Sequence, residues 1–124
     1  MQGKRMFVHD YRRVGFYMIT MVAGGRRKRF GECRDNQVFL SPEGKVVQRR
    51  WHEIPTHRPE IEASTMQVMP DHLHGILYVK APLEKPVGNT LRGFASGVTS
   101  ELRKTSGNPT LKVWEKGFHD RVIM

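Results

Sequence analysis

The 124-residue chain carries 21 lysines and arginines against 12 acidic residues, which gives a net charge of +9 and a pI near 10.2. Its 38% hydrophobic content fits one folded domain over residues 1–124, and no apolar run reaches the roughly 20 residues of a membrane span. A single cysteine, Cys33, excludes an internal disulfide. We therefore expect a soluble, cytoplasmic protein without membrane contact, whose partner is a polyanion, with nucleic acid as the first candidate.

The first part of the chain predicts three short strands and a basic loop. Residues 14–22 read as an apolar strand, residues 30–33 are expected to pair with it, and residues 38–40 form a further strand. Between the first two, Gly24 opens a hairpin tip that ends in Arg26, Arg27, Lys28 and Arg29. Positive charges on a tip can follow a phosphate backbone, although exposed tips are also often charged for solubility alone.

A capped helix and a hairpin are expected next. Ser41 can cap a helix that has Pro42 at its first position, and Trp51 lies on the apolar face of that helix, where we expect it in the core. Residues 61–69 then form a strand, and Pro70-Asp71 turns the chain into a second strand that starts at His72.

The last third of the chain predicts a helix and a final strand. Asn89 is expected to cap the helix, whose apolar stripe includes Leu91, Phe94, Val98 and Leu102, and residues 111–123 form the strand. The order is β, small hairpin, α, β, β, α, β. This is the split βαβ pattern of an α+β, ferredoxin-like sandwich, with an antiparallel sheet and two helices on one face.

The most informative feature is the pair His72 and His74, separated by one apolar residue on a predicted buried strand. Residues two apart on a strand point to the same face, so both imidazoles would project side by side, as two ligands of one ion must. Neutral imidazole is the commonest metal ligand, and a half-open site favours Mg²⁺ or Mn²⁺ acting on a phosphate. A pair of surface or hydrogen-bonded core histidines is the alternative interpretation.

The residues around this pair resemble a known family. Met69-Pro70-Asp71-His72-Leu73-His74-Gly75-Ile76 resembles the Met-Pro-Asn-His-hydrophobic-His-Gly-Ile signature of single-tyrosine HUH transposases, the insertion-sequence 200-like enzymes and their REP-associated relatives. The resemblance runs from about Gly15 to Ile123. Three further stretches carry it: residues 51–55 resemble the Trp-x-x-Ile-Pro helix end, residues 91–99 the second helix, and residues 113–123 the last strand.

This resemblance implies a reaction on DNA. Members of the family cleave single-stranded DNA at the foot of a hairpin, where a tyrosine hydroxyl attacks the phosphodiester and leaves a 5′-phosphotyrosine link and a free 3′-hydroxyl. It implies that His72 and His74 hold a divalent Mg²⁺ or Mn²⁺ that polarises the phosphate, and that the partner is hairpin-bearing, REP- or element-end-like single-stranded DNA. Some members act as dimers and others alone, so a homodimer stays open.

The family's nucleophile has no counterpart in this sequence. It belongs to a Tyr-Ile-x-x-Asn-Pro type helix after the last strand, which also supplies an asparagine or glutamine as third metal ligand, and the sequence stops at Met124 before such a helix. Of its tyrosines, Tyr11 lies near the N-terminus, Tyr17 is expected in the core, and Tyr78 lies about 13 Å beyond His74 on the same strand face. We leave the catalytic residue unassigned and expect a truncated domain that does not nick DNA alone.

Other residues are candidates for supporting roles. His119 and Asp120 could lie near the ion if the last strand borders the histidine strand; the alternative is a surface histidine and a turn aspartate. The predicted DNA-binding cations are Arg12, Arg13, Arg26, Arg27, Lys28, Arg29, Arg92, Arg103 and Lys104.

Three functions remain in competition. The first is a transposase-type HUH domain, which metal-dependent DNA cleavage would select. The second is a nucleic-acid-binding module without catalysis, which metal-independent binding would select. The third is an unrelated metalloenzyme acting on a small substrate, which the excess of positive charge opposes.

Overall fold

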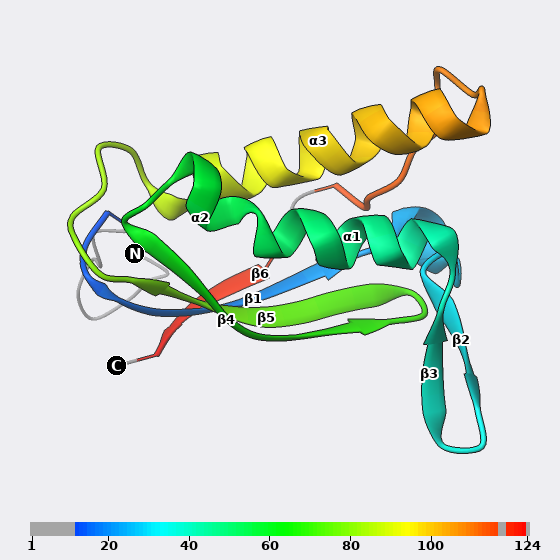
Figure 1. The fold of residues 1–124 in the computed structure, drawn as a ribbon, viewed down its shortest axis with the longest axis horizontal. Coiled ribbons are helices and arrows are strands. Elements are labelled where there is room, and N and C mark those ends of the chain that lie inside the picture. The colour runs from blue at the N-terminus through cyan, green and yellow to red at the C-terminus, as the bar shows by residue number, and fades with distance from the viewer. Residues whose placement is uncertain (1–11, 117–118, 124) are drawn as a thin grey trace.

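The computed structural model describes residues 12–116 and, for the backbone, residues 119–123. Helices and strands alternate along the chain in the order that the sequence predicts (Figure 1). The elements are β1 (Gly15–Val22), the 3-10 turn η1 (Gly24–Arg26), β2 (Gly31–Arg34), β3 (Gln37–Leu40), α1 (Pro42–His52), α2 (Ile54–His57), β4 (Ile61–Met69), β5 (His72–Val79), α3 (Val87–Ser106) and β6 (His119–Ile123).

The main sheet has four strands in the order β4-β5-β1-β6, and each neighbouring pair is antiparallel. Helices α1 and α3 lie together on one side of this sheet (Figure 1). Because β5 separates β1 from β4, the unit β1–α1–β4 is a split βαβ unit, and β5–α3–β6 is a second. The predicted α+β, ferredoxin-like architecture is therefore confirmed.

Alternation along the central strands separates a packed face from an open one. Tyr17, Ile19 and Leu73 are fully buried beneath the helices, whereas Phe16 and Met18 are 41% and 39% exposed. Successive side chains of a strand point to opposite faces, so the helices cover one face and leave the other open. Within the described residues, no helix is long and apolar enough to cross a membrane.

A tryptophan and a glycine join the helical layer to the sheet behind His74. Trp51 on α1 is fully buried and meets the Phe94 ring edge-on at 5.6 Å between centroids. A Cβ at Gly75 would lie 2.7 Å from the Trp51 ring and 2.8 Å from the Cβ of Met66. Glycine at this position therefore allows the indole to touch the backbone of β5, and the prediction of Trp51 in the core is confirmed.

The start of α1 forms as the sequence predicts. Ser41 is its N-cap, and its hydroxyl accepts a hydrogen bond from the backbone N–H of Gly44 at 3.0 Å. The start of α3 does not: the helix begins at Val87 after Pro86, without a side-chain cap, and Asn89 lies inside its first turn. The predicted Asn89 cap is wrong, because the N-cap position is held by Pro86, three residues earlier, whose ring fixes φ near the value observed there.

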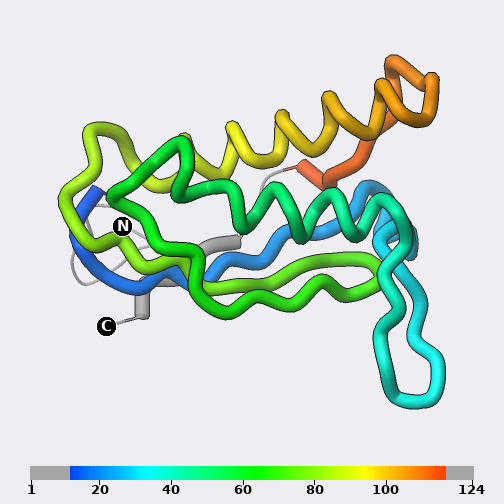
Figure 2. The backbone as a smooth tube through the Cα atoms, viewed as in Figure 1, coloured from blue at the N-terminus to red at the C-terminus, as the bar shows by residue number. Residues whose placement is uncertain are grey.

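The prediction that residues 30–33 pair with the first strand is also wrong. Both edges of β1 are taken by β5 and β6, and β2 pairs instead with β3 in a separate two-stranded sheet. The turn of this hairpin is Asp35-Asn36, whose positive φ values of 52° and 60° suit a two-residue β-hairpin turn. The hairpin projects away from the body of the molecule on the open side of the main sheet (Figures 1 and 2).

The basic segment expected at a hairpin tip has a different structure. Gly24–Arg26 forms the short 3-10 turn η1, and the chain then runs to Phe30, which is fully buried. The backbone N–H of Phe30 donates to the carbonyl of Pro70 at 2.9 Å, and that of Ala23 to Asp71 at 2.8 Å. These bonds tie the segment to the β4–β5 turn, next to the start of the histidine strand.

The final strand is shorter than the sequence predicts. Residues 111–116 contain only an isolated antiparallel bridge between Ala23 and Trp114, and the strand β6 covers His119–Ile123. Trp114 packs between the layers, where its indole N–H donates to the carbonyl of Ala95 on α3. Residues 111–116 are therefore held by this packing and by two backbone hydrogen bonds, from Gly24 N–H to the carbonyl of Val113 and from Glu115 N–H to the carbonyl of Val22, rather than by a continuous ladder.

An ion cluster holds α1 to α3. Arg49 and Arg50 both donate to the carboxylate of Glu101, with 2.8 Å between Arg50 Nε and Glu101 Oε1. The hydrogen bond from Arg49, and then the one from Arg50, hold the pKa of Glu101 below its ordinary value despite partial burial.

This cluster predicts a pH-dependent contribution to stability. Because the pKa of Glu101 is lower in the folded state than in the unfolded state, its ionised carboxylate stabilises the fold at pH values above the unfolded-state pKa near 4.5. This contribution to stability is lost as the pH falls through the folded-state pKa of Glu101. Glu101→Gln should therefore lower the free energy of unfolding at pH 7 by about 0.5–1 kcal/mol, and the difference from wild type should shrink on acidification below the unfolded pKa. Urea unfolding at pH 7 and pH 3 measures it, with Glu84→Gln in the exposed loop before α3 as the control. A pH-independent difference would contradict the assignment.

Candidate metal centre and nucleic-acid interface

The two histidines lie at the beginning of β5, on the open face of the sheet. Their ring centroids are 5.3 Å apart and their planes meet at 79°. His74 is exposed, and the side chain of His72 retains 29% of its accessible surface. The two rings therefore stand side by side as the strand alternation predicts, within reach of solvent and of a large substrate.

Asp71 fixes the orientation of the first histidine. Its Oδ1 lies 2.8 Å from His72 Nδ1, and this hydrogen bond is the main reason that the pKa of Asp71 falls below its ordinary value. An ionised carboxylate only accepts hydrogen bonds, so His72 Nδ1–H is the donor. The lone pair of the neutral imidazole is then on Nε2, which is the tautomer required of a metal ligand held by a carboxylate.

The role of Asp71 can be tested by two substitutions. Asp71→Ala removes the acceptor and, on the expectation that the two histidines hold Mn²⁺, should weaken the binding of that ion by about 10- to 100-fold, while Asp71→Asn keeps a carbonyl oxygen that can accept from Nδ1 and should bind it close to wild type. Isothermal titration calorimetry with Mn²⁺ gives both affinities. Equal weakening in the two variants would show that the negative charge, and not orientation of His72, is what matters.

Two further oxygen-bearing side chains share a row of the sheet with His74. Gln67 on β4 pairs directly with His74, and Thr20 on β1 pairs with it from the other side. Directly opposed side chains on an antiparallel pair lie on the same face, about 5 Å apart at Cβ. Gln67 is not among the ligands predicted from the sequence, although the two-residue turn at Pro70-Asp71 fixes the hairpin register and pairs residue 67 with residue 74.

The donor set fits a divalent ion only in part. Among the residues whose side chains are described, no group of three or more histidine, cysteine, aspartate or glutamate side chains is arranged around one point. His72 and His74 supply two nitrogens, and Gln67 and Thr20 could supply neutral oxygens. A mixed nitrogen and oxygen set of this kind suits Mn²⁺ better than Mg²⁺, which prefers oxygen ligands.

Neither described tyrosine is arranged as a nucleophile at this site. Tyr17 is fully buried on the helical side of the sheet, and its hydroxyl donates to the carbonyl of Arg13 at 2.8 Å, which confirms its placement in the core. Tyr78 is on the open face but stacks against Phe16, with 4.5 Å between ring centroids. Tyr11 lies outside the described residues.

His119 and Asp120 were predicted to lie near the ion on the condition that the last strand borders the histidine strand. The structure places β6 beside β1 and not beside β5, so the condition stated for these residues is not met. In the backbone register His119 pairs with Thr20, which in turn pairs with His74. His119 is therefore two strands away from His74, a backbone separation of about 10 Å.

The basic residues predicted to bind DNA fall into three groups. Arg26–Arg29 lie beside the β4–β5 turn, and the charge of Arg26 contributes to the lowered pKa of Asp71, so this segment borders the histidine pair. Arg12 and Arg13 precede β1 at the opposite end of the sheet. Arg92, Arg103 and Lys104 lie on α3 in the helical layer, across the sheet from the two histidines.

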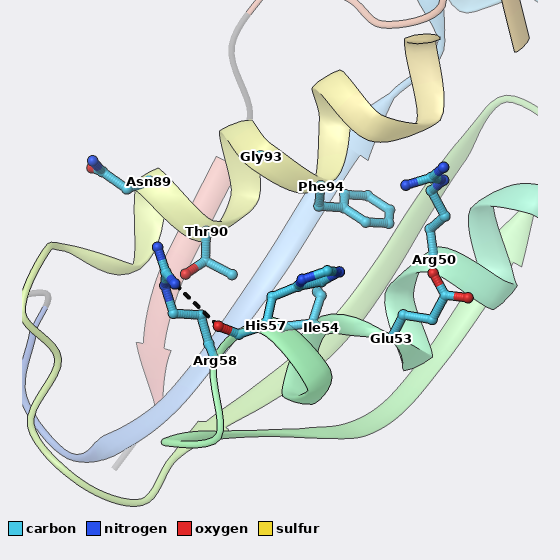
Figure 3. A pocket seen from close by; sticks show the side chains of 9 residues that line it. All are labelled: Arg50, Glu53, Ile54, His57, Arg58, Asn89, Thr90, Gly93 and Phe94. Carbon is cyan, nitrogen blue, oxygen red and sulfur yellow. Dashed lines mark hydrogen bonds between the residues drawn. The ribbon is translucent and has the colours of Figure 1, made fainter. Parts of the chain in front are cut away.

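A separate cavity of about 370 Å³ lies in the helical layer, between α1, α2 and the start of α3 (Figure 3). Arg50 and Arg58 line it together with His57, Asn89 and Thr90. Arg50 is paired with Glu101, and Arg58 donates to the carbonyl of His57. The cavity is therefore on the face of the sheet opposite to the histidine pair, and two of its cations already have partners.

Comparisons with known proteins point to one fold. No protein-family model matches the chain. A protein of Haemophilus influenzae described only as uncharacterized is 29% identical over 139 residues, covering 96% of this chain and 76% of that protein. A REP-associated tyrosine transposase solved bound to a REP hairpin has a similar structure, with a TM-score of 0.67 and 16% identity over 97% of this chain.

A second solved structure agrees with the first. It comes from Deinococcus radiodurans R1, has been provisionally assigned as a transposase, and superposes with a TM-score of 0.66 and 12% identity over the whole of this chain and 87% of its own. At these identities the similarity establishes a shared fold. This chain spans 62% of the length of the REP-associated transposase. The activity and the DNA partner of that longer protein are therefore not assigned to this chain by the similarity alone.

Proposed function

We propose that this chain is the metal-binding and DNA-binding part of a transposase-type DNA strand transferase that acts on single-stranded DNA bearing a hairpin. The observation that carries the proposal is the pair His72 and His74, side by side on the open face of a ferredoxin-like sheet. The net charge of +9 and the similarity to a transposase bound to a REP hairpin support a hairpin DNA as the partner.

Each residue of the site has a part in this proposal. His72 and His74 hold the divalent ion through imidazole nitrogens, Asp71 keeps His72 in the required tautomer, and Gln67 is the nearest described candidate for an oxygen ligand. When bound, Mn²⁺ or Mg²⁺ would polarise the scissile phosphate and stabilise its developing charge. Arg26–Arg29 border the site and would hold the phosphate backbone next to it.

The nucleophile is proposed to come from outside the described residues. A tyrosine hydroxyl that attacks phosphorus forms a phosphotyrosine bond and releases the 3′-oxygen of the preceding nucleotide. Tyr17 is buried and Tyr78 lies about 13 Å along the strand from His74. Tyr11, which lies outside the described residues, a further segment or a second copy would have to supply the tyrosine, and whether the protein acts as a homodimer depends on that choice.

These observations also favour a second candidate, a nucleic-acid-binding module without catalysis. A cleavage assay separates the two: 3′-labelled single-stranded hairpin DNA, whose label stays with the fragment that becomes linked to the tyrosine, is incubated with Mn²⁺, or with EDTA as control, using this chain and the same chain extended by its native downstream codons. A covalent protein–DNA adduct formed only by the extended protein and only with metal supports the strand transferase. Metal-independent binding by both proteins, without cleavage, supports the binding module.

A further inference from the structure

The open face of the sheet carries an apolar lane that runs away from the histidine pair. Met18 on β1 pairs with Ile76 on β5, two residues beyond His74. Phe16 pairs with Tyr78 after another two residues, and their rings stack at 4.5 Å with 16° between the planes. All four side chains follow the alternation that places His72 and His74 on the same face.

Two side chains of this lane are clearly exposed to solvent. Phe16 and Met18 are 41% and 39% exposed, so the core does not account for them. Beside His74 the lane is hollowed by a cavity of about 290 Å³, whose walls include Met18, Gln67 and Ile76. Aromatic rings and a hollow next to a phosphate-binding site are features that an unpaired nucleobase can use, because every base has an apolar face that stacks.

The charged residues around the lane limit the directions in which a single strand of DNA could lie on it. Glu62 on β4 pairs with Tyr78 and makes the β4 side unfavourable for phosphates. The exposed Arg13 precedes β1 at the aromatic end, and Arg26–Arg29 lie at the histidine end. A phosphate backbone would therefore follow the β1 side, with its bases toward the lane.

We propose that this lane binds the unpaired bases next to the scissile phosphate, and that Phe16 and Tyr78 form the stacking platform at its far end. The inference rests on the proposed function, because the histidine pair sets where the phosphate lies. The platform is about 13 Å from His74, which is the length of about four nucleotides stacked at ~3.4 Å each. The recognised chemistry is thus a short unpaired segment, distinct from the double-stranded stem of a hairpin.

The test is binding of a fluorescent twelve-nucleotide thymidine strand, followed by anisotropy at several salt concentrations. Replacing Phe16 and Tyr78 together by alanine should raise the Kd at least about tenfold, since stacking supplies that much per base, and leave the salt dependence unchanged, since no phosphate contact is lost. Phe16→Ala alone, at an exposed position, should give a smaller loss. Phe16→Trp keeps a ring and should keep the affinity.

Phe39→Ala is the matched control, because Phe39 is 40% exposed but lies on the projecting β2–β3 hairpin; it should bind like wild type. An abasic strand of the same length should bind wild type and the double variant equally. If wild type and the double variant bind the thymidine strand with equal affinity, the stacking platform is overturned while the proposed function is not. A dimer that the Phe16 substitution dissociates would also overturn it, by showing that a second copy covers the face. Failure of wild type to bind these strands and also the hairpin DNA of the cleavage assay would instead overturn the proposed function.

Discussion

Replacing His72 and His74 together by alanine is expected to abolish Mn²⁺ binding and to reduce DNA cleavage by the extended protein at least about 100-fold. The physical reason is that these rings supply both nitrogen ligands of the proposed half-site, and no alternative cluster of three ligating side chains exists among the described ones. Affinity for hairpin DNA should fall less than about tenfold, because arginine and lysine contacts to phosphates dominate it. Calorimetry, cleavage gels and anisotropy measure the three quantities.

The matched control is the double variant His52→Ala, His57→Ala. Both residues are exposed and lie at the ends of α1 and α2, on the other side of the sheet. This variant should bind Mn²⁺ and cleave DNA like wild type. Cleavage retained by the His72, His74 variant, or lost equally in the control, would show that the metal assignment is wrong.

Trp51→Ala is expected to cause the largest loss of stability, about 3–5 kcal/mol in the free energy of unfolding. Trp51 is fully buried, packs edge-on against Phe94, and fills the space that Gly75 leaves at the centre of the sheet. A loss of this size is a large part of the roughly 5–15 kcal/mol that stabilises a typical domain. Urea unfolding followed by circular dichroism measures it.

Phe39→Ala serves as the comparison for this prediction, since Phe39 is exposed on the β2–β3 hairpin. It should change the free energy of unfolding by less than about 1 kcal/mol. If Trp51→Ala costs no more than this control, the indole does not join α1 to the sheet as the structure indicates.

Local signals predicted those parts of the fold that depend on neighbours in sequence. The Ser41 cap, the strand Ile61–Met69, the turn at Pro70-Asp71 and the apolar stripe of α3 follow from spacing alone, and all are present. The partner of residues 30–33 does not follow from spacing, because it depends on which strand occupies each edge of β1. The positive φ of Asp35 and Asn36 marks the real hairpin turn, and their residue types carried that signal.

In the candidate site, too, residue spacing predicted some features, and others depend on side-chain geometry and packing. Strand alternation predicts that His72 and His74 share one face, and the register of a hairpin with a two-residue turn also indicates Gln67 as the partner of His74. The hydrogen bond from His72 to Asp71 depends on side-chain geometry, which spacing does not carry. The cations of α3 belong to the helical layer, whereas the two histidines lie on the open face of the sheet. This separation follows from the packing of the helix on the sheet, which residue spacing does not predict.

The central claim, that the two histidines of β5 hold one divalent ion, is tested most directly by NMR of the imidazole groups during a Mn²⁺ titration. Paramagnetic Mn²⁺ broadens the signals of nuclei close to it. We predict that the His72 and His74 signals broaden together at substoichiometric Mn²⁺, while those of His52 and His57 stay sharp. Broadening of all four at the same concentration, or of neither member of the His72 and His74 pair, would contradict the claim.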